Sequence, residues 1–221
     1  MRLAAGENTS ITAIENNFSS ASIGASFKYD TGGVYMFKIN YAIMDKEDEI
    51  RTFIPSDCYI YGLFEMVANE KGYGIYSEKK EIRNCPGIFE NLPFWFEQLT
   101  AIVKKIKKHG YALLNEVESY NTWIEFIYKE NFIELSIIRV ENCTEGPYFS
   151  FEDILPSERE YGEWKKEKVS FEEFSSEVIK TADSFLRTIY SINPTLRKDF
   201  TLRTIEKNLL CYKRDSRKTS E

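Results

Sequence analysis

Alternating apolar and polar residues predict antiparallel strands in the first half of the chain. Residues 22–29 alternate apolar with small or charged side chains, which is the period of a half-buried strand. Gly32 and Gly33 tolerate the positive φ angles of a tight hairpin, and the β-branched and aromatic residues of 34–43 predict the return strand. A charged turn then leads to a third short strand over residues 51–54, so this half begins with a small antiparallel sheet.

The second half has the pattern of a three-stranded meander. Its candidate strands cover residues 111–117, 122–128 and 132–140. Asn131 closes the loop between the last two strands and can adopt the left-handed conformation that a tight hairpin requires. Residues 141–168 contain two prolines and two glycines, and they are predicted as a loop.

Apolar residues at helical spacing mark four further segments. They predict helices over residues 57–70, 92–109, 170–192 and 201–212. The first of these predictions depends on the spacing of Ile60, Leu63 and Phe64. The third helix begins with a capping box formed by Ser170 and Glu173, in which side chains satisfy backbone amides of the first turn.

The order of these elements favours an α+β protein in which long amphipathic helices cover antiparallel hairpin and meander sheets. We expect a flexible N-terminal segment at 1–17, α+β subdomains at 18–110 and 111–212, and a disordered tail at 213–221. The two halves follow a similar order, strands and then a helix. No residue-level repeat supports a duplication.

Charge and cysteine spacing exclude several classes of partner. The chain has 29 basic and 35 acidic side chains and a net charge of −6, which argues against binding to a phosphate backbone. Cys58, Cys85, Cys143 and Cys211 lack the C-x-x-C spacing of a zinc site. No apolar run has the length of a secretory signal or a membrane span, so we expect a cytoplasmic protein with free thiols and no membrane partner.

The usual catalytic and cofactor motifs are missing from the sequence. Its single histidine, His109, follows a run of lysines at a predicted helix end, where a solvated cation is expected. No nucleophile elbow and no phosphate-binding glycine loop occurs. We therefore predict no catalytic residue, no metal site and no cofactor. Paired carboxylates are too numerous for an enzyme of unrecognised type to be excluded.

The strongest charge feature is the stretch from Glu141 to Glu163, which contains seven acids and one base, Arg159. We call residues 141–164 the acidic segment. Acids that steer a basic protein, mixed with aromatic anchors, are typical of a docking surface. Alternatively, the segment is a solvated loop whose aromatic residues pack beneath the sheet. The predicted partner-binding residues are Glu145, Tyr148, Phe149, Glu152, Asp153, Glu158, Glu160, Tyr161, Glu163 and Trp164.

The second half also resembles a known group of proteins. The meander TWIEFIYKENFIELSIIRVE, the acidic loop, the stretch WKKEKVSFEEFSSEV and the helix ending in FLRTI and NP carry the likeness. Over residues 120–194 the chain resembles small cytosolic immunity proteins of bacterial polymorphic toxin systems. The resemblance implies a stoichiometric inhibitor that plugs the active site of a toxin. The choice of the acidic segment as the plug comes from its charge, and no residue role is carried over.

These observations lead to three functional hypotheses. The first is a non-catalytic protein-binding module, an immunity protein that inhibits a basic toxin through the acidic segment. The second is an uncharacterised enzyme that uses carboxylates in a cleft between the subdomains. The third is a structural or scaffold module of a mobile element. The sequence leaves the identity of the partner and the oligomeric state open.

Overall fold

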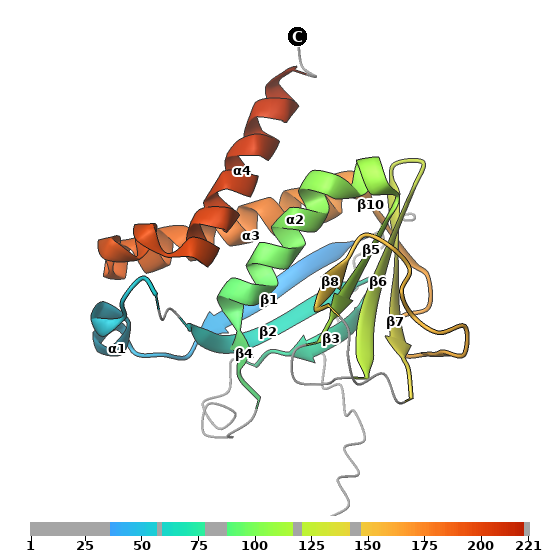
Figure 1. The fold of residues 1–221 in the computed structure, drawn as a ribbon, viewed down its shortest axis with the longest axis horizontal. Coiled ribbons are helices and arrows are strands. Elements are labelled where there is room, and N and C mark those ends of the chain that lie inside the picture. Colours follow the sequence, from blue (N-terminus) through green and yellow to red (C-terminus); the bar gives the residue numbers. More distant parts are fainter. Residues whose placement is uncertain (1–35, 57–58, 78–87, 117–120, 142–146, 219–221) are drawn as a thin grey trace, which may run out of the picture. The chain divides into compact units, whose positions relative to one another are not determined.

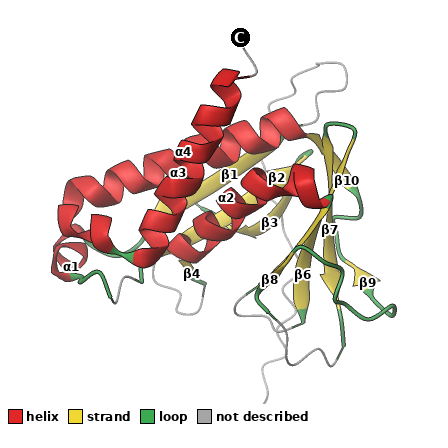
Figure 2. Cartoon of the chain, turned by 45° about the horizontal axis from the view of Figure 1, so that its top comes forward, coloured by secondary structure: helices red, strands yellow, loops and turns green. Residues whose placement is uncertain are grey.

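The computed structural model describes residues 36–56, 59–77, 88–116, 121–141 and 147–218. Within these residues, the strands form a four-stranded and a six-stranded antiparallel sheet. Figure 1 shows the long helices α2, α3 and α4 gathered over the strands, and Figure 2 shows the same grouping from a second direction. The predicted α+β class is confirmed.

The four-stranded sheet is built around one central strand. Strand β2 (Tyr61–Ala68) pairs with β1 (Phe37–Ile43) on one side, and with both β3 (Lys71–Ile75) and β4 (Glu90–Asn91) on the other. A two-residue turn with positive φ at residues 69–70 joins β2 to β3. The predicted strand at 34–43 is therefore confirmed for its described part.

The helix predicted over residues 57–70 is wrong, because most of this range is strand β2. Phe64, Met66 and Ala68 alternate into the main core, with the period of a strand. Leu63 lies fully buried outside that core cluster. Because a central strand is apolar on both faces, its residues also matched the helical spacing.

A short helix stands where a charged turn and a strand were predicted. Helix α1 covers Glu47–Thr52, and its first turn carries three acids, which suits the positive end of a helix dipole. The backbone amide of Lys46 donates a hydrogen bond of 3.1 Å to the Glu49 carboxylate. Side-chain capping therefore supports a helix that is too short to be recognised from periodicity.

The six-stranded sheet contains the predicted meander. Strands β5 (Tyr111–Asn115), β6 (Thr122–Lys129) and β7 (Phe132–Arg139) pair in sequence order. Glu130 and Asn131 form the β6–β7 turn with φ of 48° and 71°, which is the left-handed conformation expected at Asn131. All three predicted strands and the position of this turn are confirmed.

The stretch predicted as a loop also adds strands to this sheet. Strand β8 (Phe149–Ser150) pairs with β5, whereas β9 (Glu160–Tyr161) and β10 (Glu167–Ser170) pair with β7. The prediction of a plain loop over 141–168 was therefore wrong. These pairings are only two to four residues long, so they leave no alternating pattern in the sequence.

The remaining helices agree closely with the sequence. Helix α2 covers Leu92–His109 and ends at Gly110, whose φ of 76° suits a glycine. Helix α3 covers Phe171–Ile192, and the Ser170 hydroxyl accepts a hydrogen bond of 3.1 Å from the Glu173 amide, one half of the predicted capping box. A 3-10 helix, η2 (Pro194–Lys198), leads to α4 (Phe200–Lys218). Residues 213–218 are thus helical rather than a disordered tail.

One core crosses the predicted boundary between subdomains. The Phe96 ring in α2 stacks on Phe185 in α3 at a centroid distance of 4.9 Å, and Phe64 in β2 stacks on Trp95 at 4.8 Å. The same cluster includes Phe126 of β6. The inner faces of both sheets therefore pack against a shared set of helices.

Several predictions fall on residues that the structure does not describe. They are the flexible segment 1–17, the strand over 22–29, the hairpin at Gly32 and Gly33, and the candidate binding residue Glu145. In the described part of the chain, no helix is long and apolar enough to cross a membrane. Cys211 in α4 is a free thiol.

Candidate functional site

The acidic segment crosses the outer face of the six-stranded sheet, on the side away from the helices. Its described part leaves strand β8 at the β5 edge and reaches β9 at the β7 edge. Midway, Leu155 packs into a small apolar cluster with Leu113, Trp123 and Ile138 from the three central strands. The segment is therefore packed onto the sheet and does not project as a free loop.

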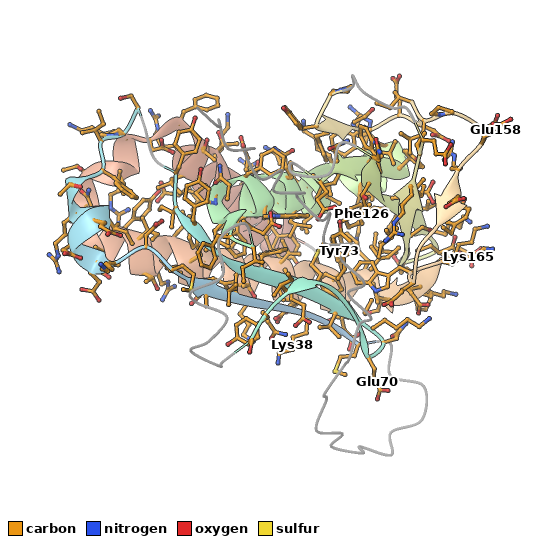
Figure 3. The ribbon with its side chains drawn as sticks, turned by 90° about the horizontal axis from the view of Figure 1, so that it is seen from below. Lys38, Glu70, Tyr73, Phe126, Glu158 and Lys165 are labelled. Atoms are coloured by element: carbon orange, nitrogen blue, oxygen red, sulfur yellow. The ribbon has the colours of Figure 1, made fainter. Side chains whose placement is uncertain are left out.

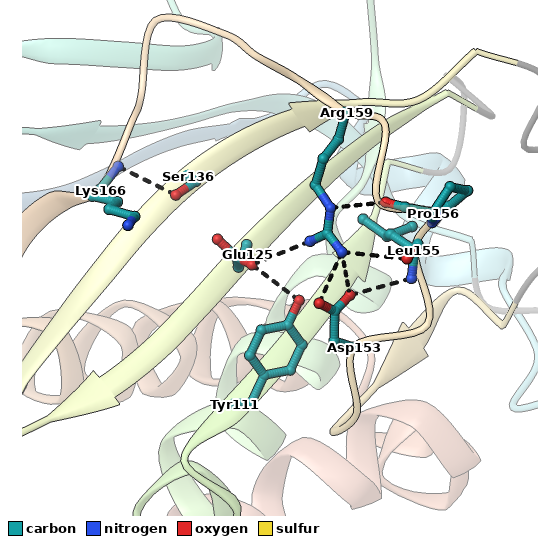
Figure 4. Close-up of polar contacts among 8 residues, drawn as sticks. All are labelled: Tyr111, Glu125, Ser136, Asp153, Leu155, Pro156, Arg159 and Lys166. Carbon is teal, nitrogen blue, oxygen red and sulfur yellow. Dashed lines mark hydrogen bonds and ion pairs between the residues drawn. The ribbon is translucent and has the colours of Figure 1, made fainter.

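A partly buried arginine attaches the segment to this face (Figure 4). The guanidinium of Arg159 lies 2.8 Å from a carboxylate oxygen of Asp153 and 3.7 Å from the carboxylate of Glu125. It also donates to the backbone carbonyls of Pro156 and Leu155 at 2.9 and 3.3 Å. Only 14% of the Arg159 side chain and 5% of the Glu125 side chain are exposed, so this pair is largely shielded from water, whereas the carboxylate of Asp153 is half-exposed.

The acceptor inside the sheet is a buried carboxylate. Glu125 belongs to β6, and the hydroxyl of Tyr111 in β5 donates a hydrogen bond of 3.1 Å to it. Burial, together with the nearby Glu125 and Asp153 charges, raises the pKa of Tyr111. Burial alone would lower the pKa of Arg159, but the hydrogen bonds and charges of Asp153 and Tyr111 together outweigh burial and raise that pKa. Tyr111 thus stays a neutral donor and Arg159 stays a cation.

Backbone bonds fix the far end of the segment. The amide of Gly162 donates to the carbonyl of Ile137, and the amide of Ile137 donates to the carbonyl of Trp164, at 2.9 and 3.0 Å. The amide of Lys166 donates to the buried hydroxyl of Ser136 at 3.2 Å (Figure 4). The segment is therefore held in one conformation from β8 to β10.

The aromatic residues of the acidic segment divide into buried and exposed groups. Trp164 is fully buried, and its indole donates to the carbonyl of Lys71 at 3.1 Å, so it is not part of the exposed surface that the sequence suggested. Phe149 is half-buried against Phe151, whose ring stacks on His109 at 4.5 Å. Trp164, Phe149 and Phe151 therefore agree with the alternative interpretation, in which the aromatic residues of the segment pack against the protein.

Two aromatic residues of the segment do face solvent. Tyr148 is 53% exposed and Tyr161 is 38% exposed. Ile154, which the sequence did not single out, is exposed between the acids. Its only signal was an apolar residue directly after Glu152 and Asp153. The exposed apolar part of the surface is therefore Tyr148, Ile154 and Tyr161.

The carboxylates of the segment also divide into two groups, one bound by Arg159 and one exposed. Asp153 is bound by Arg159 and is largely neutralised. Among the described residues, no ion pair is formed by the other acids of the segment, all of which are exposed. They are Glu141, Glu152, Glu158, Glu160 and Glu163. Figure 3 places Glu158 at the periphery, far from the core residue Phe126 and separate from Lys165.

Hollows also occur among the described residues away from this surface. A groove of about 750 Å³ lies between α2, the start of α3 and α4, and it is lined by Lys104, Lys107 and Phe171 among others. A smaller pocket of about 270 Å³ lies at the start of α2 and α4. Within the described ranges, no group of three or more His, Cys, Asp or Glu side chains could hold a metal ion.

No protein-family model, curated protein or solved structure matches this chain. The resemblance to immunity proteins therefore stays a prediction.

Proposed function

We propose that this chain is a non-catalytic protein-binding module of the immunity type, which inhibits a basic partner through the acidic segment. The supporting observation is that some residues of the segment attach it to the sheet while others face solvent. Arg159 and Leu155 attach it to the sheet, while Glu152, Glu158 and Glu160 point to solvent without an ion pair among the described residues. The surface is thus ordered before a partner arrives.

Order of this kind favours tight binding. A surface that is already fixed loses little conformational entropy on association, so more of the interaction energy appears as affinity. The exposed acids accelerate the encounter with a basic surface, and they also discriminate against acidic proteins. Tyr148, Ile154 and Tyr161 provide the apolar contacts that become desolvated at the centre of an interface.

A growth-protection assay tests this proposal. A basic toxin domain, selected by screening for binding to the full chain, is expressed in bacteria together with the full chain, or with the triple variant Glu152→Lys, Glu158→Lys and Glu160→Lys. The wild type is expected to restore growth and the triple variant to fail at equal protein levels. The matched control is Asp48→Lys, an exposed acid on α1. Equal protection by all three proteins would contradict the proposal.

A further inference from the structure

The smaller pocket lies where the first turns of two helices meet. Its lining includes Tyr59 from the loop after α1, Phe94 and Glu97 from α2, and Asp199 and Phe200 at the start of α4. Further along the helices, the Lys104 ammonium of α2 donates to Asn208 of α4 at 3.1 Å. The two helices therefore run in the same direction, and their N-terminal ends border one cavity.

The walls of this pocket are aromatic and unusually exposed. Phe200 is 78% exposed although it occupies the first turn of a long helix, and Tyr59 is 54% exposed. Leaving such rings in water forgoes the stabilisation that burial would give. The faces of phenyl and phenol rings attract cations, because the ring quadrupole is negative at its faces.

The floor of the pocket carries two carboxylates. Asp199 is only 7% exposed, and it caps α4 by accepting a hydrogen bond of 2.9 Å from the Leu202 amide. Glu97 lies half-buried nearby, and burial, followed by the charge of Asp199, raises the pKa of Glu97. No lysine or arginine lines the pocket, and neither acid forms an ion pair in the part of the chain that the structure describes. No basic side chain therefore offsets the two carboxylates, and the partial positive charges at the N-termini of α2 and α4 offset them only in part.

We infer that this cavity, which we call the cation pocket, binds the guanidinium or ammonium head of a basic side chain presented by a protein partner. The carboxylates of Glu97 and Asp199 would receive the charged head, and the rings of Tyr59 and Phe200 would enclose its aliphatic stem. A volume of about 270 Å³ suits one side chain better than a larger ligand.

The cation pocket adjoins the acidic segment. The ring of Tyr148, just before strand β8, meets the ring of Phe94 edge-on at a centroid distance of 6.1 Å. A partner that covers Tyr148 at this edge of the sheet could therefore also place a basic side chain in the cation pocket. The inference rests on the proposed function for the source of the cation, and it adds a second anchor point.

Butylguanidinium tests the pocket without any partner. The full chain, labelled with ¹³C at phenylalanine and tyrosine, is titrated at pH 7.5 and followed by NMR. We expect shifts centred on Phe200 and Tyr59 with a dissociation constant on the order of 1 mM, the range for a ligand of this size. Butylurea, the neutral isostere, is expected not to shift these signals.

Variants identify the groups that bind. The pair Glu97→Gln and Asp199→Asn is expected to weaken butylguanidinium binding roughly tenfold, through loss of charge-assisted hydrogen bonds. Asparagine keeps the helix cap, so folding is preserved. Phe200→Ala is expected to weaken binding roughly threefold. Asp48→Asn and Leu210→Ala, an exposed acid and an exposed apolar residue elsewhere, are expected to change nothing.

The outcomes separate this inference from the proposed function. Equal binding of butylurea, or unchanged binding by the Glu97 and Asp199 variant, would overturn the cation pocket. Because no partner is present, that result would leave the acidic segment as the docking surface. Conversely, butylguanidinium binding at Phe200 together with full growth protection by the Glu152, Glu158 and Glu160 variant would support the pocket and contradict the proposed function.

Discussion

The guanidinium of Arg159 lies 3.7 Å from the carboxylate of Glu125, so the acidic segment and the centre of the six-stranded sheet share a buried ion pair. Glu125 is almost fully buried, whereas the acids next to Arg159 in sequence face solvent. The one base in an acidic stretch is thus directed inward, away from the proposed partner. This arrangement orders the surface and preserves its negative charge.

Replacing Arg159 with methionine should destabilise the protein markedly. The change leaves the Glu125 charge buried without its partner, which typically costs about 3 kcal/mol. Urea unfolding of the single variant measures the loss. The double variant Arg159→Met and Glu125→Gln removes both charges and should recover part of the stability. A single variant as stable as the wild type would show that the pair does not hold the segment.

Substitution of Asn193 should also lower the stability of the protein. Its amide donates to the carbonyls of Ile50 and Phe53, each at 3.0 Å, and its oxygen accepts from the Thr195 amide. It thereby joins the α3–η2 connection to the end of α1. Asn193→Asp keeps the acceptor and removes the donors, so it should cost about 2 kcal/mol of unfolding free energy. Thermal unfolding that is unchanged in this variant would mean that the two donor bonds contribute little.

Two glycines of strand β3 should respond differently to alanine. Gly74 has a φ of 97°, and a Cβ there would lie 2.3 Å from the backbone oxygen of Phe64, whereas a Cβ on Gly72 meets only the flexible side chain of Glu65. We expect Gly74→Ala to cost about 2 kcal/mol or more and Gly72→Ala about 1 kcal/mol or less. Denaturant midpoints of the two variants measure the difference. Equal midpoints would contradict the backbone geometry of β3.

Glu97 should oppose folding at neutral pH. Burial and the charge of Asp199 raise its pKa in the folded state, so ionisation is less favourable there than in the unfolded chain. This cost is absent below the unfolded pKa, near 4.5, and appears as the pH rises through the higher folded pKa. Because Glu97 is partly exposed, Glu97→Gln should stabilise the protein by less than about 1 kcal/mol at pH 7.

Urea unfolding at several pH values tests this sign. The advantage of Glu97→Gln should be present at pH 7 and should disappear near pH 3.5, where both states of the wild type are protonated. Glu70→Gln, at an exposed acid in the β2–β3 turn, serves as the matched control. A variant that is less stable than the wild type at pH 7 would indicate that the Glu97 charge is compensated.

Local patterns in the sequence were sufficient to predict most of the fold. The capping by Ser170, the stop at Gly110 and the turn at Asn131 are determined by neighbouring residues, so they could be predicted. Strand β2 could not, because its apolar residues face two sides and fit either period. Strands β8 and β9 were missed because they are defined by partners far away in sequence.

The candidate site could be predicted only in part from the sequence, for the same reason. Net charge located the acidic segment, and Glu158 and Tyr161 do face solvent. Trp164 is buried against β3, where its indole donates a hydrogen bond to the carbonyl of Lys71. No local pattern in the sequence reveals this contact. The cation pocket was missed entirely, since Glu97 and Asp199 lie in different helices and are distant in sequence.

The central claim, that the acidic segment docks onto a basic toxin, is tested most directly by the affinity of the chain for such a toxin. Calorimetry at 0.15 M salt compares the wild type, the triple variant Glu152→Lys, Glu158→Lys and Glu160→Lys, and the control Asp48→Lys. Reversal of three interface charges is expected to weaken binding roughly 100-fold, while the control changes it less than about threefold. Equal affinity of the triple variant and the wild type would contradict the docking role of the acidic segment.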